Sequence, residues 1–337
     1  MNKLNKIGVS ALCGSLAAFS AANAGELTVS GGADMTWMSQ NDAVTGNPLG
    51  IGSDFGLAGS GELDNGWSVA LAITMTNANS YSNTSVTVGV PGIGDILFNQ
   101  GGSGTGIQRL DDVTPTVWEE ADGAGLSATI NKISGGSAGA TIEITPEATP
   151  DGLTARFAYT ADADGSSSTS DKGTGGDSGV AGAGWDLTFE ASDALHGVSG
   201  LSVYGGLAQV DQYANGAATT GDRSEHVWGV KYAIGGFTVG YQVTNEETGV
   251  TGTTEYDNTS YGITFNVNDN LSVGYGHVES DESGQGLETP EADTFQAAYT
   301  MGGATFRIAD ISVDNQGYSA ASTADLDTRV VSLGLAF

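Results

Sequence analysis

Residues 67–76 read WSVALAITMT, and large apolar side chains occupy every second position from Trp67 to Met75. Ser, Ala and Thr fill the positions between them. In an extended chain, successive side chains point to opposite sides, whereas a helix repeats every 3.6 residues. The stretch therefore predicts a β-strand with one apolar face and one face of small or polar residues.

The same alternation recurs at residues 237–243, 271–275, 295–301 and 331–337, and no segment has a comparable period of 3.6. Alternation alone also suits a soluble β-sandwich or a β-solenoid. The second face separates these classes, because it carries Gly, Ser, Thr, Ala and Gln where a water-facing sheet carries Lys, Glu and Arg. An apolar face opposite a small, polar one is typical of a transmembrane barrel. We therefore predict an all-β, antiparallel transmembrane β-barrel.

Composition narrows the functional classes. The chain has 337 residues, 53 of them Gly, and 40 acidic residues against 10 Lys plus Arg give a net charge of −30. Nucleic-acid binding is excluded, because phosphates require basic partners. A hydrophobic content of 39% is too high for a disordered chain. No apolar run reaches about 18 residues, so no transmembrane helix is expected.

The N-terminal residues resemble an export signal. Two lysines precede an apolar stretch at residues 7–19, and an A-x-A cleavage pattern ends at Ala24. This pattern predicts a cleaved signal peptide at 1–24 and a mature chain of 25–337.

The only cysteine, Cys13, lies inside the predicted signal peptide. Leu12 precedes it where a lipidated cysteine needs a small residue, so a lipoprotein is not expected. Cleavage removes two lysines and no acids, and the mature net charge becomes 8 − 40 = −32. An exported chain without disulfides needs another source of stability. A closed, hydrogen-bonded barrel provides one.

Turn signals divide the chain into hairpins with short connections at one end and long, acidic loops at the other. The short turns contain Gly, Pro, Asn or Asp and are 64–66, 91–92, 235–236, 268–270 and 302–303. The long connections are 161–180, 211–223, 246–254, 281–290 and 314–325.

These signals predict sixteen strands. The strands are expected to begin near residues 26, 51, 66, 84, 93, 140, 152, 182, 200, 224, 237, 255, 271, 292, 304 and 326. Counting residues 125–133 as a strand would give seventeen and place a long loop on the short-turn side. Parity therefore assigns that segment to the third long loop.

Three places carry a resemblance to a known family. The last strand, 327–337, alternates and ends on an aromatic residue. Residues 141–147 followed by 151–153 are similar to a sixth strand, a short turn and a seventh strand. Residues 92–99 precede a long Gly-rich loop, as a fifth strand does before a constriction loop. In this layout the mature chain resembles the general trimeric porins of Gram-negative bacteria.

The resemblance implies a sixteen-stranded barrel of the outer membrane whose third loop, at about 100–139, folds inward. It implies a homotrimer in contact with outer-membrane lipid and lipopolysaccharide. It also implies a water-filled channel for ions and small hydrophilic solutes, and a C-terminal Phe337 that the assembly machinery reads.

The resemblance places the charged residues of the third loop at the narrowest point of the lumen, where they would act like a selectivity ring. The alternative is that they are solvated loop charges with no special position. These residues are Arg109, Asp111, Asp112, Glu119, Glu120 and Asp122.

The charge of the wall departs from the family, in which early strands supply many arginines. No Lys or Arg occurs between Gly25 and Gln108. Alternation points three basic residues inward, either as part of a positive wall or as simple lumen ion pairs: Arg156, Lys231 and Arg307. The inward acids include Asp34, Asp54, Glu62, Glu143, Asp186 and Glu190. A negative lumen concentrates cations, so we predict a cation preference that is strongest at low ionic strength.

Other functional classes also fit the sequence. An acidic barrel closed by its loops, or a secreted calcium-dependent surface protein, would be structural or adhesive. Acidic outer loops can also bind Ca²⁺ or Mg²⁺ that bridges lipopolysaccharide, and no tightly bound cofactor is expected. No enzymatic activity is expected, because His196, His226 and His277 lie far apart and no nucleophile elbow occurs.

Overall fold

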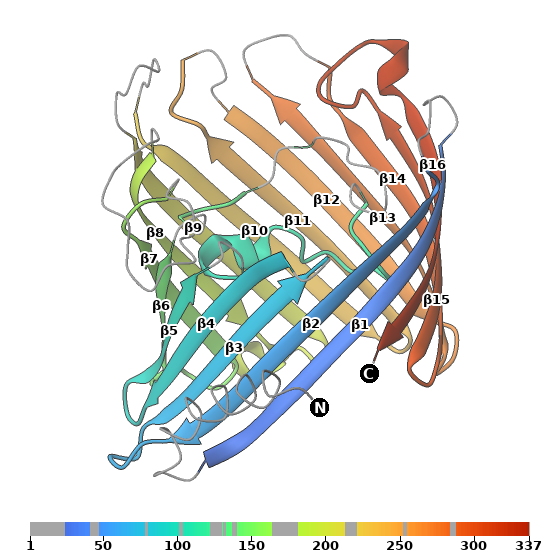
Figure 1. Cartoon of the computed structure of the whole chain (residues 1–337). Helices are drawn as coiled ribbons and strands as arrows, with labels where there is room; N and C mark the ends of the chain where they lie inside the picture. The colour runs from blue at the N-terminus through green and yellow to red at the C-terminus, as the bar shows by residue number, and fades with distance from the viewer. Residues whose placement is uncertain are drawn as a thin grey trace, which may run out of the picture.

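The computed structural model is a closed antiparallel barrel of sixteen strands (Figure 1). The structure describes residues 24–40, 47–77, 80–100, 104–121, 130, 133–136, 140–163, 181–212, 221–251, 255–283 and 288–336. The predicted signal peptide therefore lies outside the described residues except for Ala24, and Phe337 and Asp122 also lie outside them.

Each strand pairs with its neighbours in sequence. The first eight strands are β1 Ala24–Gln40, β2 Leu49–Glu62, β3 Ser68–Thr76, β4 Ser80–Val90, β5 Gly94–Gln100, β6 Thr141–Pro146, β7 Leu153–Thr160 and β8 Ala181–Ala191. The remaining eight are β9 Leu201–Gln212, β10 Arg223–Ile234, β11 Phe237–Glu247, β12 Glu255–Asn266, β13 Leu271–Glu282, β14 Glu291–Met301, β15 Ala304–Asp314 and β16 Leu326–Ala336. The barrel closes where β1 pairs with β16, with Gly32 opposite Ala336.

The predicted strand number is confirmed, and every strand begins within four residues of its predicted start. Of the segment 125–133, only residues 130 and 133 are described. The predicted hairpin turns are confirmed as the short connections between β2 and β3, β4 and β5, β10 and β11, β12 and β13, and β14 and β15.

Helical structure is sparse in the described part of the chain. It consists of two 3-10 turns, η1 Gly106–Leu110 and η2 Ser322–Ala324, and one short helix, α2 Asp193–His196, in the connection between β8 and β9. None of these is long and apolar enough to cross a membrane.

The outer surface of the barrel is apolar. Large hydrophobic side chains on alternate positions are exposed, as shown by Ile51 at 76% and Phe295 at 65%. A water-soluble sheet would bury such a face, so this band is suited to lipid.

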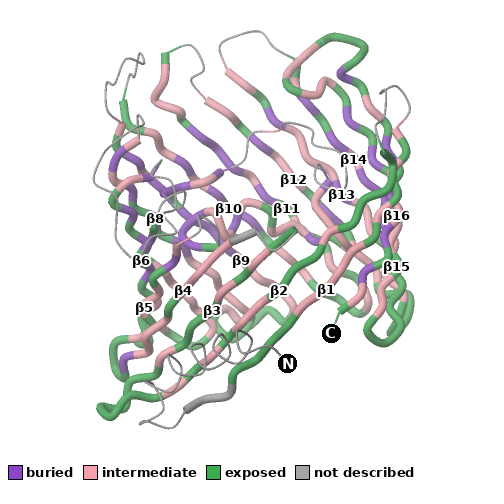
Figure 2. Tube along the Cα trace, in the orientation of Figure 1, coloured by how far each residue is buried: buried purple, intermediate pink, exposed green. Residues whose placement is uncertain are grey.

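The inner surface differs between the two sides of the barrel (Figure 2). The described residues of β1, β2 and β3 include none that is buried, whereas β8 to β11 contain many. The difference arises because the segment between β5 and β6 packs on the inner side of the later strands and leaves the early strands open.

Two apolar clusters lie inside the barrel, where alternation had predicted small or polar residues. One joins Ile107 and Leu110 of η1 with Tyr204 and Val227 of the wall. The other contains Ala309, Ile311 and Val330 of β15 and β16, with Trp118 of the loop packed against it. The interior is thus apolar where loop and wall meet.

Candidate functional site

Three buried carboxylates point into the lumen. Trp185 and Leu187, on either side of Asp186, are exposed on the outer surface, whereas Asp186 is only 1% exposed. Successive residues of a strand face opposite sides, so Asp186 faces inward. The same alternation places Glu143 on β6 and Glu225 on β10 inward, and both are also buried.

All three carboxylates bind the backbone of the segment between β5 and β6, called here the third loop. Gly106 donates its N–H to Glu143 Oε2 at 2.8 Å. Ile107 donates its N–H to Asp186 Oδ2 at 3.1 Å, and Gly136 donates to Oδ1 of the same carboxylate at 2.9 Å. One side chain on β8 therefore joins two parts of the third loop: the outgoing limb, which follows β5 and contains Gly106 and Ile107, and the returning limb, which leads to β6 and contains Gly136.

Glu225 holds the returning limb a second time. Its Oε2 accepts the N–H of Ser134 at 2.9 Å and of Gly135 at 2.7 Å. Arg223 lies beside it, with Nε 3.1 Å from Glu225 Oε1 and Nη2 donating to the carbonyl of Gly135 at 2.6 Å. The charge of this buried carboxylate is thus balanced by an arginine and two amide donors.

The far part of the loop is held by β14 and β15. Gln296 Oε1 accepts the N–H of Trp118 at 2.8 Å, and Gln296 Nε2 donates to the carbonyl of Glu119 at 2.6 Å. The Trp118 ring lies 5.7 Å from the guanidinium of Arg307, a cation–π distance.

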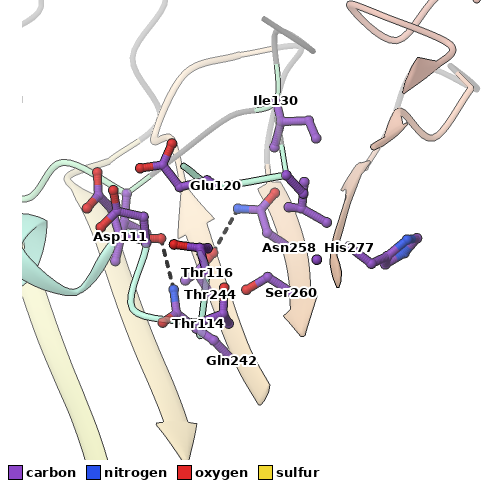
Figure 3. Close-up of a pocket in the computed structure, with 15 residues that line it drawn as sticks. Asp111, Thr114, Thr116, Glu120, Ile130, Gln242, Thr244, Asn258, Ser260 and His277 are labelled. Atoms are coloured by element: carbon purple, nitrogen blue, oxygen red, sulfur yellow. Dashed lines mark hydrogen bonds between the residues drawn. The ribbon is translucent and has the colours of Figure 1, made fainter. Parts of the chain in front are cut away.

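Between these two attachments, the loop runs close to the wall of β11 and β12. Gln242 donates to the carbonyl of Asp111 at 2.9 Å, and Asn258 donates to Thr244 at 2.8 Å (Figure 3). Asp111 and Glu120 of the loop border the recess that these wall residues line. The recess is polar on its wall side and carries acids on its loop side.

The described lumen arginines are all paired with carboxylates. Besides Arg223, the pairs are Arg109 with Glu143, Arg156 with Glu190 at 2.6 Å, and Arg307 with Asp34 at 3.1 Å. Lys231 instead lies 5.7 Å from the Tyr204 ring, and it has no carboxylate partner among the described residues.

Several acids are without a basic partner. Within the described ranges, no ion pair involves Asp54, Glu62, Asp112 or Glu119. Asp54 lies with Asp34 and Arg307 around a recess of about 380 Å³ on the open side of the lumen. Among the described lumen residues, the acids without a basic partner therefore outnumber Lys231, the one base without a carboxylate partner.

Burial shifts two ionisable groups of the third loop. Desolvation raises the pKa of Glu119, and the neighbouring Glu120 carboxylate raises it further. Desolvation lowers the pKa of Arg109 from its ordinary value, although the Glu143 carboxylate opposes this effect.

The structure brings only some of the predicted site residues together. Asp111, Asp112 and Glu120 border one recess, and Glu119 lies near Arg307 and Asp34. Arg109 is turned to Glu143, and Arg156, Lys231 and Arg307 lie on β7, β10 and β15. Asp34 and Asp54 follow the inward alternation on β1 and β2, and Glu62 ends β2 opposite Ser68.

Four residues that hold the loop were not predicted as site residues: Arg223, Glu225, Gln242 and Gln296. The inward position of Gln242 and Gln296 could have been read from the exposed aromatic residues beside them, Tyr241 and Phe295, whereas Arg223 and Glu225 have polar neighbours that give no such signal. The partners of all four could not be read, because most of these bonds join a side chain to loop backbone.

No metal site is found within the described residues, where no three His, Cys, Asp or Glu side chains lie close enough to hold an ion. His277 lies on the outer face and contacts Asp293 at 2.9 Å, with Tyr275 also bound to Asp293. Divalent cations at the acidic loops stay a prediction.

The chain is similar to known porins. A family model described as Gram-negative porin matches residues 8–306. Among solved structures, in-vitro folded OmpT of Vibrio cholerae has a TM-score of 0.65 and 14% identity, covering 93% of this chain and 98% of that one. The anion-selective porin from Comamonas acidovorans has a TM-score of 0.62 and 16% identity, and the match covers 93% of this chain and 99% of that one.

Salmonella typhi OmpF in complex with daunomycin has a TM-score of 0.66 and 13% identity, covering 93% of this chain and 98% of that one. At these identities the structural matches establish the fold alone. No curated protein sequence matches the chain significantly.

Proposed function

The chain belongs to the Gram-negative porin family, and from this premise we propose that it is a passive diffusion channel of the outer membrane that prefers cations. Its solutes are ions and small hydrophilic molecules. The third loop, at about 100–139, narrows the lumen through which they pass. Ions cross the lumen by diffusion, and the charges along the path set the preference.

The observation that carries the cation preference is the pairing of the arginines. Each described lumen arginine contacts a carboxylate, whereas Asp54, Glu62, Asp112 and Glu119 have no basic partner within the described part of the chain. An ion pair contributes little field at a distance, whereas an unpaired carboxylate attracts cations within the Debye length, about 10 Å at 0.1 M salt. Among the described residues these four acids outnumber Lys231, the one base without a carboxylate partner, and this balance favours a negative field in the lumen.

The distribution of these charges supports the same proposal. The open side of the lumen is bordered by β1 to β5, which contain no Lys or Arg. Asp34 and Asp54 lie on this side, and the one basic side chain at their recess is Arg307 from β15. Solutes on the open side thus pass carboxylates.

Reversal potentials across a KCl gradient test the proposal. The wild-type channel is expected to prefer K⁺ over Cl⁻, with a larger ratio at low salt because screening is weaker. Asp54→Asn removes one unpaired charge and is expected to lower the ratio. Leu97→Ala, on β5, changes no charge and serves as the control. Anion preference in the wild type would refute the cation preference, and absence of conductance steps would refute the channel itself.

We also propose a homotrimer in lipid that contains lipopolysaccharide. The family resemblance supports it, and the small outward residues Gly31 and Ala33 on β1 permit close approach between barrels. Conductance that closes in groups of three equal steps, and a native mass three times that of one chain, are the expected results. A single step per inserted particle would contradict the trimer.

A further inference from the structure

We propose that Asp186, together with the backbone of Gly106, Ile107 and Gly136, forms a carboxylate latch that sets the aperture of the channel. Asp186 is a positioning residue: it touches no solute and acts by joining the two limbs of the third loop. The inference rests on the proposed channel function for its effect on permeation, although the latch itself is a feature of the fold.

The geometry of Asp186 supports the latch. Its two oxygens accept one N–H from each limb, Ile107 at 3.1 Å and Gly136 at 2.9 Å. These two residues are separated by 29 positions of sequence (136 − 107) and lie on one carboxylate. Asp186 is 1% exposed and lies on a strand of the wall, so the limbs are tied to a rigid support.

The loop backbone is shaped to admit this carboxylate. Gly106 has φ of +56° and Gly135 has φ of +60°, values that L-residues other than glycine rarely adopt. A Cβ at Gly106 would overlap Asp186 Oδ2, and a Cβ at Gly135 would lie 2.5 Å from the same oxygen. The two glycines thus leave the space that Asp186 occupies, one on each limb.

Neighbouring groups anchor each limb separately, so the latch has a distinct role. Glu143 holds the outgoing limb through Gly106, and Glu225 holds the returning limb through Ser134 and Gly135. Of these three carboxylates, only Asp186 accepts hydrogen bonds from both limbs. Its loss is therefore expected to let the limbs move relative to each other while each stays near the wall.

Two matched pairs of variants separate the latch from charge and from backbone strain. Gly106→Ala removes no charge and displaces the carboxylate. Gly104→Ala, at φ of +77° with no atom within 4 Å, imposes similar strain without that contact. Asp186→Ala removes a carboxylate and both acceptors. Glu225→Gln removes a carboxylate but keeps an amide oxygen for the two N–H groups that one oxygen of Glu225 accepts.

The first measurement is hydrogen exchange of the Ile107 and Gly136 amides in the purified barrel, which does not depend on conduction. Wild type, Gly104→Ala and Glu225→Gln are expected to protect both amides. Gly106→Ala and Asp186→Ala are expected to lose protection on both limbs. Asp186→Asn keeps one acceptor oxygen, so protection is expected to be lost on one limb only. This variant provides the test if Asp186→Ala fails to fold.

The second measurement is single-channel conductance with the size limit for neutral sugars. Gly106→Ala and Asp186→Ala are expected to replace one conductance level by several and to admit larger sugars, with heat-modifiable gel mobility unchanged. Exchange in both variants like that of the wild type would overturn the latch. Absence of conduction in the wild type together with the expected exchange pattern would overturn the channel function and leave the latch standing.

Discussion

Glu119 is a residue at which the fold changes acid–base behaviour. It lies in the third loop beside Glu120, and burial together with that neighbour raises its pKa above the usual glutamate value. The folded loop thus favours the protonated form. The raised pKa of Glu119 therefore adds to the free energy of unfolding at low pH, where the carboxyl is protonated. That contribution is lost as pH rises through the raised pKa.

The raised pKa predicts an acid-dependent selectivity. As pH falls, Glu119 loses its charge before an ordinary glutamate, with a pKa of about 4.3, does. The K⁺ over Cl⁻ ratio is expected to begin its decline above that range in the wild type. Reversal potentials at a series of pH values measure this, and Glu119→Gln is expected to abolish the first part of the decline.

Asp112→Asn provides the control for Glu119. It removes one charge from the same loop at an exposed position and is expected to lower the ratio at neutral pH while the early decline persists. If the early decline of the K⁺ over Cl⁻ ratio persists in Glu119→Gln, a group other than Glu119 causes it.

At the level of single residues, the sequence supports positions better than partners. Alternation alone placed Asp186 and Glu143 inward, because the apolar residues beside them must face lipid. It did not predict what they bind, since Ile107 and Gly136 contribute only their amides. A backbone donor has no side-chain signature, so the latch is visible only in the folded structure.

At the level of elements, the glycines of β11, β12 and β13 make room for the third loop. Gly240 on β11 pairs with Gly262 on β12, which pairs with Gly276 on β13. A Cβ at Gly240 would overlap the Pro115 ring, and a Cβ at Gly262 would overlap the Pro115 carbonyl oxygen. The glycine-rich wall therefore lets the loop backbone approach the sheet closely.

This packing predicts that Gly240→Ala displaces the loop. A rigid proline ring cannot move aside as a flexible side chain can, so overpacking of about 1–3 kcal/mol is expected. The conductance level is expected to change with it. Planar-bilayer recordings and the free energy of unfolding in urea measure the two effects.

Gly276→Ala is the matched control on the same inner surface. Its Cβ would meet Thr294 Cγ2 at 3.4 Å and Ala121 Cβ at 3.6 Å, which are ordinary contacts. It is expected to keep the wild-type conductance and stability. Equal effects of the two substitutions would argue against close packing of the loop at Pro115.

Sequence periodicity predicted the strands well and the inner surface only in part. Turn residues and a period of two locate β11, for example, at its observed start. The buried inward residues Ile311 and Val313 were not expected. They belong to a cluster on which Trp118 packs, and a contact between a loop and a distant strand leaves no local period.

At the level of the whole molecule, lipid lies outside the barrel and water inside it. Neighbouring residues of a strand therefore differ in how well they tolerate a charged side chain. Leu71 on β3 is exposed on the outer face, and Ala72 is exposed on the open side of the lumen. Leu71→Arg is expected to destabilise the folded barrel by up to about 2–4 kcal/mol, depending on depth in the bilayer. Ala72→Arg is expected to cost little.

Reversible folding into lipid vesicles measures both substitutions. The same pair tests the function, because Ala72→Arg adds a positive charge to the water-filled side and is expected to reduce the K⁺ over Cl⁻ ratio. Equal destabilisation by the two arginines would contradict the assignment of lipid-facing and water-facing surfaces.

The pairing of β1 with β16 has a consequence for how the molecule is made. Gly32 meets Ala336, so the ring of hydrogen bonds is complete only after the last strand has left the ribosome. Until then both edges present unpaired amides, which invite aggregation. The long separation between partners also makes closure slow. The chain is therefore unclosed until its last strand is made, and its net charge of −30 favours mutual repulsion and solubility until then.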